Sequence, residues 1–101
     1  MKRIINNRKY DTETAIEIGK WESSEHDRLH YVEETLYRKR TGEYFVFGRG
    51  GAGSCYAEYR GNRTYVDGES ITPLDLVDAQ NWAAANLSAD AYEAEFGEVA
   101  E

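Results

Sequence analysis

The chain has 101 residues and carries 19 acidic against 12 basic side chains, which gives a net charge of −7. This length suits one domain, residues 1–101, with a single modest core, and is too short for a complete two-half dinucleotide fold. Cys55 is the only cysteine, so no internal disulfide is possible, and no segment approaches the roughly 20 apolar residues of a membrane span. We therefore expect a cytoplasmic protein that folds without contact with a membrane.

The first 22 residues predict short elements. KRII, residues 2–5, predicts a strand that ends at Asn6-Asn7. YDTETA predicts a short helical turn near residues 11–15, with Asp11 or Thr12 as its N-cap. IEIGKWE, residues 16–22, alternates apolar and polar side chains and predicts an amphipathic strand.

The strongest strand signal covers residues 29–47. Residues 29–39 alternate between two faces, Thr41-Gly42 turns the chain, and residues 44–47, YFVF, return. SCYAEY and RTYVDG predict two further short strands with a turn at Gly61-Asn62. Residues 1–70 are therefore expected to be mainly β, as an antiparallel meander of about four to five strands.

The hydrophobic period changes near residue 71. Thr72 predicts the N-cap of a helix, with Pro73 in its first position and Asp75 as the acid of a capping box. Ser88 predicts the cap of a second helix that Gly97 ends. The expected fold class is α+β: a small antiparallel sheet packed with two short helices within residues 71–101.

The stretch GRGGAGS, residues 48–54, matches G-x-G-x-x-G through Gly48, Gly50 and Gly53. A dinucleotide site needs a long helix after this motif, whereas the chain continues with aromatic residues and a turn signal. Ser54 stands where a phosphate-binding loop has lysine. We expect a connection between two strands, and whether it also contacts a partner stays open.

HDRLH, residues 26–30, imitates a zinc-binding helix motif. If these residues lie in a strand, His26 and His30 are roughly 13 Å apart, at about 3.3 Å per residue, and cannot share a metal ion. Ser54 and Cys55 have no base nearby in the sequence. We expect no catalytic residue, metal or cofactor. A nucleotide- or metal-dependent enzyme is the functional hypothesis that the sequence favours least.

Acidic residues gather in the last third of the chain. Residues 1–50 carry ten Lys and Arg against nine acids, whereas residues 67–101 carry nine acids and no Lys or Arg. Such a field opposes direct nucleic-acid binding and favours a basic partner; the alternative is a solvated face that aids solubility. The candidate partner-binding residues are Asp67, Glu69, Asp75, Asp78, Asp90, Glu93, Glu95 and Glu98.

The segments KYDTETA, EETLYRKRTGEYFVFG, GGAGSCY, ITPLDLVDAQNWA and DAYEAEFG together resemble a family of small proteins found in phages and integrative elements of Gram-positive gut bacteria. The resemblance covers nearly the whole chain in the same order. It implies an inhibitor of a host defence complex, of the anti-CRISPR type, whose acidic surface mimics DNA and occupies the basic nucleic-acid channel of a protein or nucleoprotein complex.

A second hypothesis is a structural or regulatory accessory protein. It would self-associate through a Tyr-rich sheet face or an exposed strand edge. The two hypotheses leave monomer and homodimer open.

Overall fold

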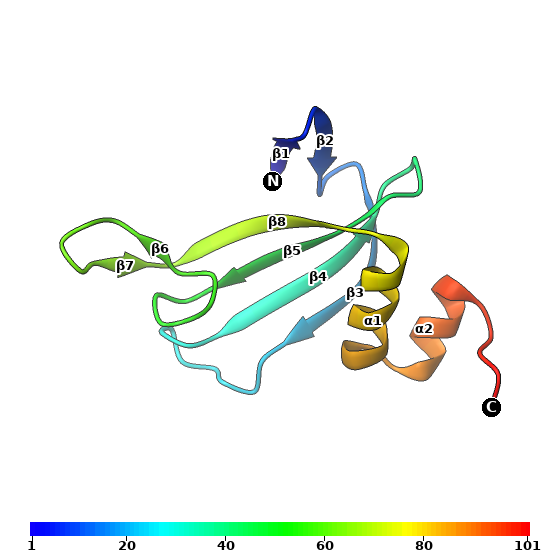
Figure 1. Ribbon diagram of the computed structural model, residues 1–101. Coiled ribbons are helices and arrows are strands. Elements are labelled where there is room, and N and C mark those ends of the chain that lie inside the picture. The colour runs from blue at the N-terminus through cyan, green and yellow to red at the C-terminus, as the bar shows by residue number, and fades with distance from the viewer.

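The computed structural model describes residues 1–101 and has eight strands and two helices (Figure 1). The elements are β1 (Lys2–Ile5), β2 (Arg8–Asp11), β3 (Ile16–Glu22), β4 (Val32–Arg38), β5 (Tyr44–Gly50), β6 (Glu58–Tyr59), β7 (Tyr65–Val66), β8 (Gly68–Leu74), α1 (Leu76–Asn86) and α2 (Ala89–Phe96). The main sheet is antiparallel, in the order β3-β4-β5-β8, and the pairs β1-β2 and β6-β7 form separate hairpins. The expected α+β class, with two C-terminal helices packed against the sheet, is confirmed.

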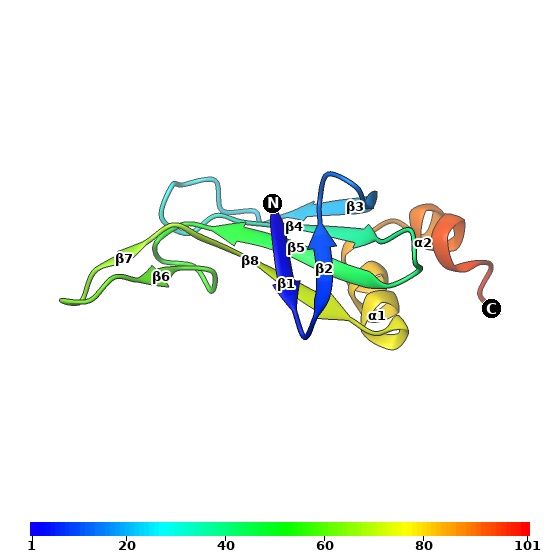
Figure 2. The same ribbon diagram turned by 90° about the horizontal axis from the view of Figure 1, so that it is seen from above.

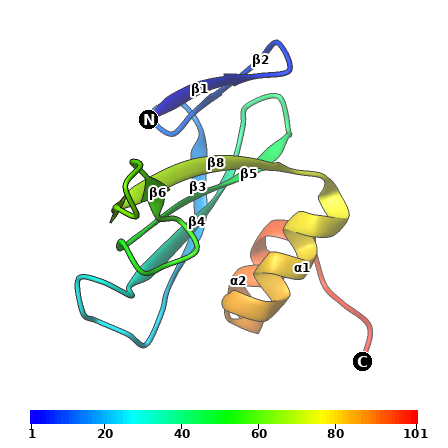
Figure 3. The same ribbon diagram turned by 60° about the vertical axis from the view of Figure 1, so that its left-hand side comes forward.

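The main sheet is covered on both faces by different parts of the chain. On one face Leu36 and Val46 pack in one cluster with Ala83 of α1. On the other face Phe45 packs with Tyr10 of β2, with ring centroids 5.6 Å apart in an edge-to-face arrangement. Figure 3 shows the β1-β2 hairpin on one side of the sheet and the helices on the other, and Figure 2 shows the hairpin crossing the strands. The molecule therefore has three layers.

The molecule is elongated, with extents of 51 × 34 × 20 Å. The helices lie at one end of the sheet, and the β6-β7 hairpin projects from the opposite end (Figure 1). Neither helix is long and apolar enough to cross a membrane.

The N-terminal hairpin turns at Asn6 and Asn7, which have φ angles of 50° and 63°. Two successive residues with positive φ are the requirement of a tight hairpin turn, and asparagine tolerates it. The strand at residues 2–5 is confirmed, whereas its partner β2 was not anticipated. Residues 12–15 form a turn in which Ala15 N–H donates to the carbonyl of Asp11 over 3.1 Å.

Strand β4 is shorter than residues 29–39, because residues 27–30 form a turn instead of extended chain. The turn at Thr41-Gly42 is confirmed: Gly42 has a φ of 96°, and its N–H donates to the carbonyl of Lys39 over 2.8 Å. The chain then returns as β5.

The prediction that Thr72 caps the first helix is wrong. Residues 71–74 continue β8, in which Pro73 lies opposite Phe45 on an edge strand, where a missing N–H is tolerated. Asp75 is the N-cap, and its carboxylate accepts from the N–H of Asp78 over 2.8 Å.

The second helix agrees with the sequence prediction. The Ser88 hydroxyl accepts from the N–H of Ala91 over 3.1 Å, and Gly97, with a φ of 92°, ends the helix.

Replacing Asp75 by alanine removes the acceptor for the first turn of α1 and is expected to lower the free energy of unfolding by about 1 kcal/mol. Asp75→Asn keeps a side-chain oxygen and should lose less. Thr72→Ala is the matched control, because Thr72 is exposed and makes no cap contact. Urea unfolding measures all three variants, and a larger loss from Thr72→Ala than from Asp75→Ala would contradict the observed helix start.

Candidate functional site

The glycine-rich stretch is only partly a loop. Gly48, Arg49 and Gly50 belong to β5 and pair with β4 on one side and β8 on the other. The turn begins at Gly51, whose N–H donates to the carbonyl of Tyr31 over 3.1 Å. The expectation of a connection between strands is therefore wrong for the first three residues of the motif.

Close packing explains the glycines of this stretch. A Cβ atom at Gly48 would overlap the ring of Tyr56, which lies directly on the strand. A Cβ atom at Gly51 would overlap the carbonyl oxygen of Arg28 from the neighbouring turn. Glycine is needed here because side chain and backbone approach the strand more closely than any Cβ allows.

Tyr56 crosses Gly48 to reach Glu34, the cross-strand neighbour of that glycine on β4. The Tyr56 hydroxyl donates to one carboxylate oxygen of Glu34, and Trp82 Nε1 of α1 donates to the other over 2.9 Å. Burial, as the larger cause, and this hydrogen bond, as the second, raise the pKa of Tyr56 well above its usual range. Glu34 therefore joins the glycine turn and α1 to the sheet.

Arg49 is the one cation of the glycine stretch, and it is already paired. Its Nε donates to Glu33 of β4 over 2.6 Å, and Glu69 lies opposite it on β8. This hydrogen bond raises the pKa of Arg49. No helix begins directly after the glycines, since the next helix is α1 at Leu76, so the glycine stretch offers no helix N-terminus to a phosphate.

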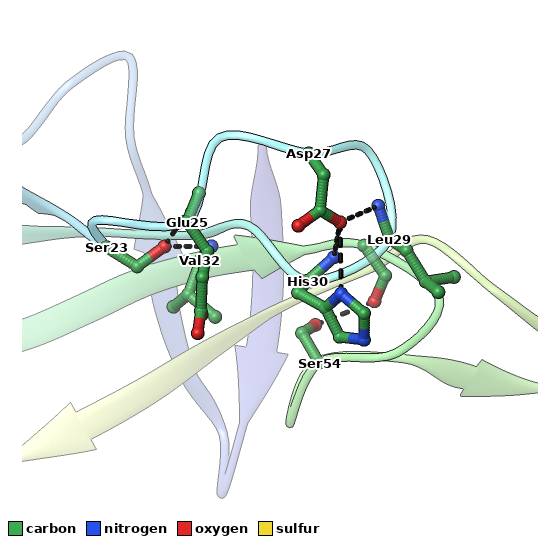
Figure 4. A network of polar contacts seen from close by, with 8 residues as sticks. Ser23, Glu25, Asp27, Leu29, His30, Val32 and Ser54 are labelled. Carbon is green, nitrogen blue, oxygen red and sulfur yellow. Dashed lines mark hydrogen bonds and ion pairs between the residues drawn. The ribbon is translucent and has the colours of Figure 1, made fainter.

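The His26–His30 motif lies in an exposed turn, drawn in Figure 4. The Asp27 carboxylate accepts from the N–H groups of Leu29 and His30 and lies 3.1 Å from His30 Nδ1. The hydrogen bond from the His30 N–H lowers the pKa of Asp27. No group of three or more His, Cys, Asp or Glu residues in the chain is arranged to hold a metal ion.

The two candidate nucleophiles are not paired with a base. The Ser54 hydroxyl donates to the carbonyl of Gly51 over 2.7 Å and accepts from the N–H of Tyr56. Cys55 is exposed and makes no hydrogen bond through its thiol. Ser54 therefore stabilises the glycine turn through local hydrogen bonds.

The eight predicted acidic residues do not share one surface. Asp67 and Glu69 lie near the β6-β7 hairpin and line a hollow that also contains Arg3 and Arg49. Glu95 points into the molecule and is described below. The remaining five, which we call the acidic helix surface, lie on the helix pair and its ends: Asp75, Asp78, Asp90, Glu93 and Glu98.

Glu95 is part of a contact between α2 and the sheet. Its Oε2 accepts from Arg38 Nε over 2.8 Å and from the Tyr44 hydroxyl over 2.5 Å, and its side chain is 11% exposed. Burial, as the larger cause, and the hydrogen bond to Glu95, as the second, raise the pKa of Tyr44 to about 12. Glu95 therefore holds the helix against the sheet and is not free for a partner.

The charges of the acidic helix surface are not neutralised by ion pairs within the molecule. None of its five carboxylates takes part in an ion pair, since the six ion pairs all use other acids. Asp75 accepts as a helix cap and Glu93 accepts from the Val99 N–H over 3.2 Å. The surface therefore presents unpaired negative charge.

Sequence reasoning missed one exposed feature, the aromatic pair on the β6-β7 hairpin. Tyr59 and Tyr65 are cross-strand neighbours with ring centroids 5.1 Å apart, and they are 58% and 56% exposed. The signal was the symmetric segment YRGNRTY, with a tyrosine on each side of a turn.

Gly48→Ala is expected to lower the free energy of unfolding by about 1–3 kcal/mol, because the added methyl group displaces Tyr56 from its place on the strand. The double variant Gly48→Ala/Tyr56→Ala removes the overlap, so it should lose clearly less than the sum of its two single variants. Denaturant unfolding of the four proteins measures the coupling, and simple additivity would contradict the packing role.

The tyrosinate form of Tyr44 is expected to appear with a pKa of about 12. The folded protein holds this proton more tightly than the unfolded chain. The free energy of unfolding should therefore fall as the pH rises from about 10 to about 12. The difference in ultraviolet absorbance between the wild type and Tyr44→Phe isolates this titration. In Glu95→Gln the pKa should fall only in part, since burial is the larger cause, and an unchanged value would contradict a role for Glu95.

Comparison of the chain with protein-family models, with curated proteins and with solved structures finds no match. The function proposed below is therefore argued from the residues of this chain.

Proposed function

We propose that this protein is a binding protein whose acidic helix surface docks onto a basic protein surface. The observation that carries the proposal is the separation of charge along the chain. Residues 1–66 carry all 12 Lys and Arg side chains and ten acids, whereas residues 67–101 carry nine acids and no Lys or Arg. Both helices lie within this anionic part, which also contains β8.

The pairing of the charges supports a partner outside the molecule. The basic side chains in ion pairs face acids of the sheet or loops, as in Arg49–Glu33 and Lys39–Glu43, and only Arg38 reaches a helix. The five carboxylates of the acidic helix surface remain unpaired. Unpaired charge of one sign on one surface steers an oppositely charged partner and accelerates its association.

The resemblance to proteins of phages and mobile elements adds the class of partner. A basic channel that binds nucleic acid is the kind of surface that an array of carboxylates complements. We therefore propose inhibition of a nucleic-acid-binding defence complex, of the anti-CRISPR type, with the acidic helix surface in the position that DNA otherwise takes.

The sheet-based alternative has less support. Tyr10 and Tyr44 of the sheet and hairpin layers are buried. The free edge of β3 carries Glu17, Lys20 and Glu22, and charged side chains on an edge strand discourage pairing with a second sheet. We therefore give this alternative less weight than docking through the acidic helix surface.

The test uses purified guide-loaded CRISPR effector complexes from Gram-positive gut bacteria and a labelled target DNA. The protein is expected to bind the effector and to reduce its binding of DNA, more strongly at low salt than at high salt. The variant Asp78→Asn/Asp90→Asn/Glu93→Gln/Glu98→Gln removes four negative charges and keeps Glu95 and the Asp75 cap. It should associate with the effector at least about tenfold more slowly.

A matched control removes four charges elsewhere: Glu13→Gln/Glu17→Gln/Glu22→Gln/Glu25→Gln. These side chains are exposed and make no ion pair. Equal losses in the two variants would mean that only net charge matters. If no effector bound the wild type, or if DNA binding were unaffected, the proposed function would be wrong.

A further inference from the structure

The β6-β7 hairpin, residues 58–66, projects from the end of the sheet that lies opposite the helices (Figure 1); we call it the finger. Tyr59 and Tyr65 are both more than half exposed although their rings contact each other. Burying aromatic side chains contributes strongly to interfaces, and this pair has no cover within its own molecule.

The tip of the finger is cationic. Between the two tyrosines the chain runs Arg60, Gly61, Asn62, Arg63 and Thr64, with no acid. Gly61, Asn62 and Arg63 all have positive φ, and the Thr64 N–H donates to the carbonyl of Gly61 over 2.9 Å, which closes a compact turn. Arg60 makes only an exposed pair with Glu58 at 3.3 Å, and Arg63 makes none. Tyrosine and arginine are among the side chains enriched at energetically important interface positions.

A groove of matching chemistry lies at the other end of the molecule. It has a volume of about 430 Å³ and runs between the end of α1 and α2. Leu87, Tyr92 and Val99 supply apolar lining, and Glu93 supplies a carboxylate. Asp90 and Glu98 flank these residues in the chain, and no Lys or Arg occurs after residue 66.

The finger and the groove cannot meet within one molecule. They lie at opposite ends of a structure whose longest extent is 51 Å. This separation also exceeds the Debye length of about 8 Å at physiological salt, so the acids of the helices do not neutralise the tip of the finger. A contact between them has to join two copies.

We propose that the finger of one copy docks in the helix groove of a second copy. Tyr59 and Tyr65 cover the apolar lining formed by Leu87, Tyr92 and Val99. Arg60 and Arg63 lie against the carboxylates of Glu93 and its neighbours. In this contact apolar side chains thus cover apolar side chains, and positive charges meet negative charges.

The surface area of the chain supports an additional contact. Its solvent-accessible surface is 6922 Å², whereas a compact monomer of 11.5 kDa has about 5,800 Å². Its radius of gyration is 14.9 Å, against about 13 Å for a compact domain of this length. The excess surface is comparable with the roughly 800 Å² that each partner covers in a standard protein interface.

The contact is head-to-tail, because it joins two different surfaces. It covers part of the acidic helix surface, so self-association and docking on a basic partner exclude each other. This last consequence rests on the proposed function, whereas the contact itself does not.

Sedimentation equilibrium of the wild type and two charge-reversed variants tests the contact. Arg60→Glu/Arg63→Glu reverses the finger, and Glu93→Lys/Glu98→Lys reverses the groove. At low salt the average mass of the wild type should rise above 11.5 kDa as the concentration increases to about 1 mM, the range in which a weak contact is half formed. Each variant alone should stay at 11.5 kDa. An equimolar mixture of the two should associate again, because the intact finger of one variant matches the intact groove of the other and the two reversed surfaces also carry opposite charge.

Lys2→Glu/Lys9→Glu is the control, with the same change of charge on exposed side chains that make no ion pair; it should associate like the wild type. Tyr59→Ser/Tyr65→Ser, which leaves every charge in place, should remain monomeric. A monomeric wild type at about 1 mM, undiminished association of the finger variants, or a mixture that stays monomeric would each overturn the proposal. Since no effector complex is present, these outcomes do not depend on whether the proposed function is correct.

Discussion

The double coverage of strand β5 is the constraint on which the rest of the structure depends. This strand pairs with β4 on one edge and β8 on the other, and its alternating side chains enter two separate clusters. Val46 meets the helices, whereas Phe45 meets the N-terminal hairpin. Full burial of a side chain such as Phe45 contributes about 1.5–3 kcal/mol. Both covering layers therefore depend on one strand, and the strand depends on both of them.

The same strand explains the glycines that follow. After Phe47, β5 continues with Gly48, which has no side chain. The ring of Tyr56, from the turn that follows, covers the strand at this position. The ring continues to Glu34, which Trp82 also contacts. A motif that looks like a nucleotide fingerprint is thus explained by packing against the sheet, with the polar contacts supplied from within the chain.

Local signals in the sequence predicted those elements that local chemistry determines. Ser88 caps the start of α2 and Gly97 caps its end, both through hydrogen bonds within a few residues. The predicted limits of this helix were therefore correct. Pro73 is compatible with a helix start and with an edge strand, and its pairing opposite Phe45, 28 positions earlier, decides between them. The negative charge of the last third could likewise be predicted from the sequence. The contact of Glu95 with Arg38 could not, because 57 residues separate the two side chains.

The two proposed contacts use the two ends of the molecule. The N-terminal hairpin and the helices each cover part of one face of the sheet, and the finger projects from the end opposite the helices. The finger needs exposed tyrosines and a left-handed turn, neither of which stabilises the core. The helix pair and its ends carry five carboxylates that take part in no ion pair. Exposed aromatic rings with arginines at one end and carboxylates outside ion pairs at the other are the features on which the two proposed contacts depend, each with a partner of opposite charge.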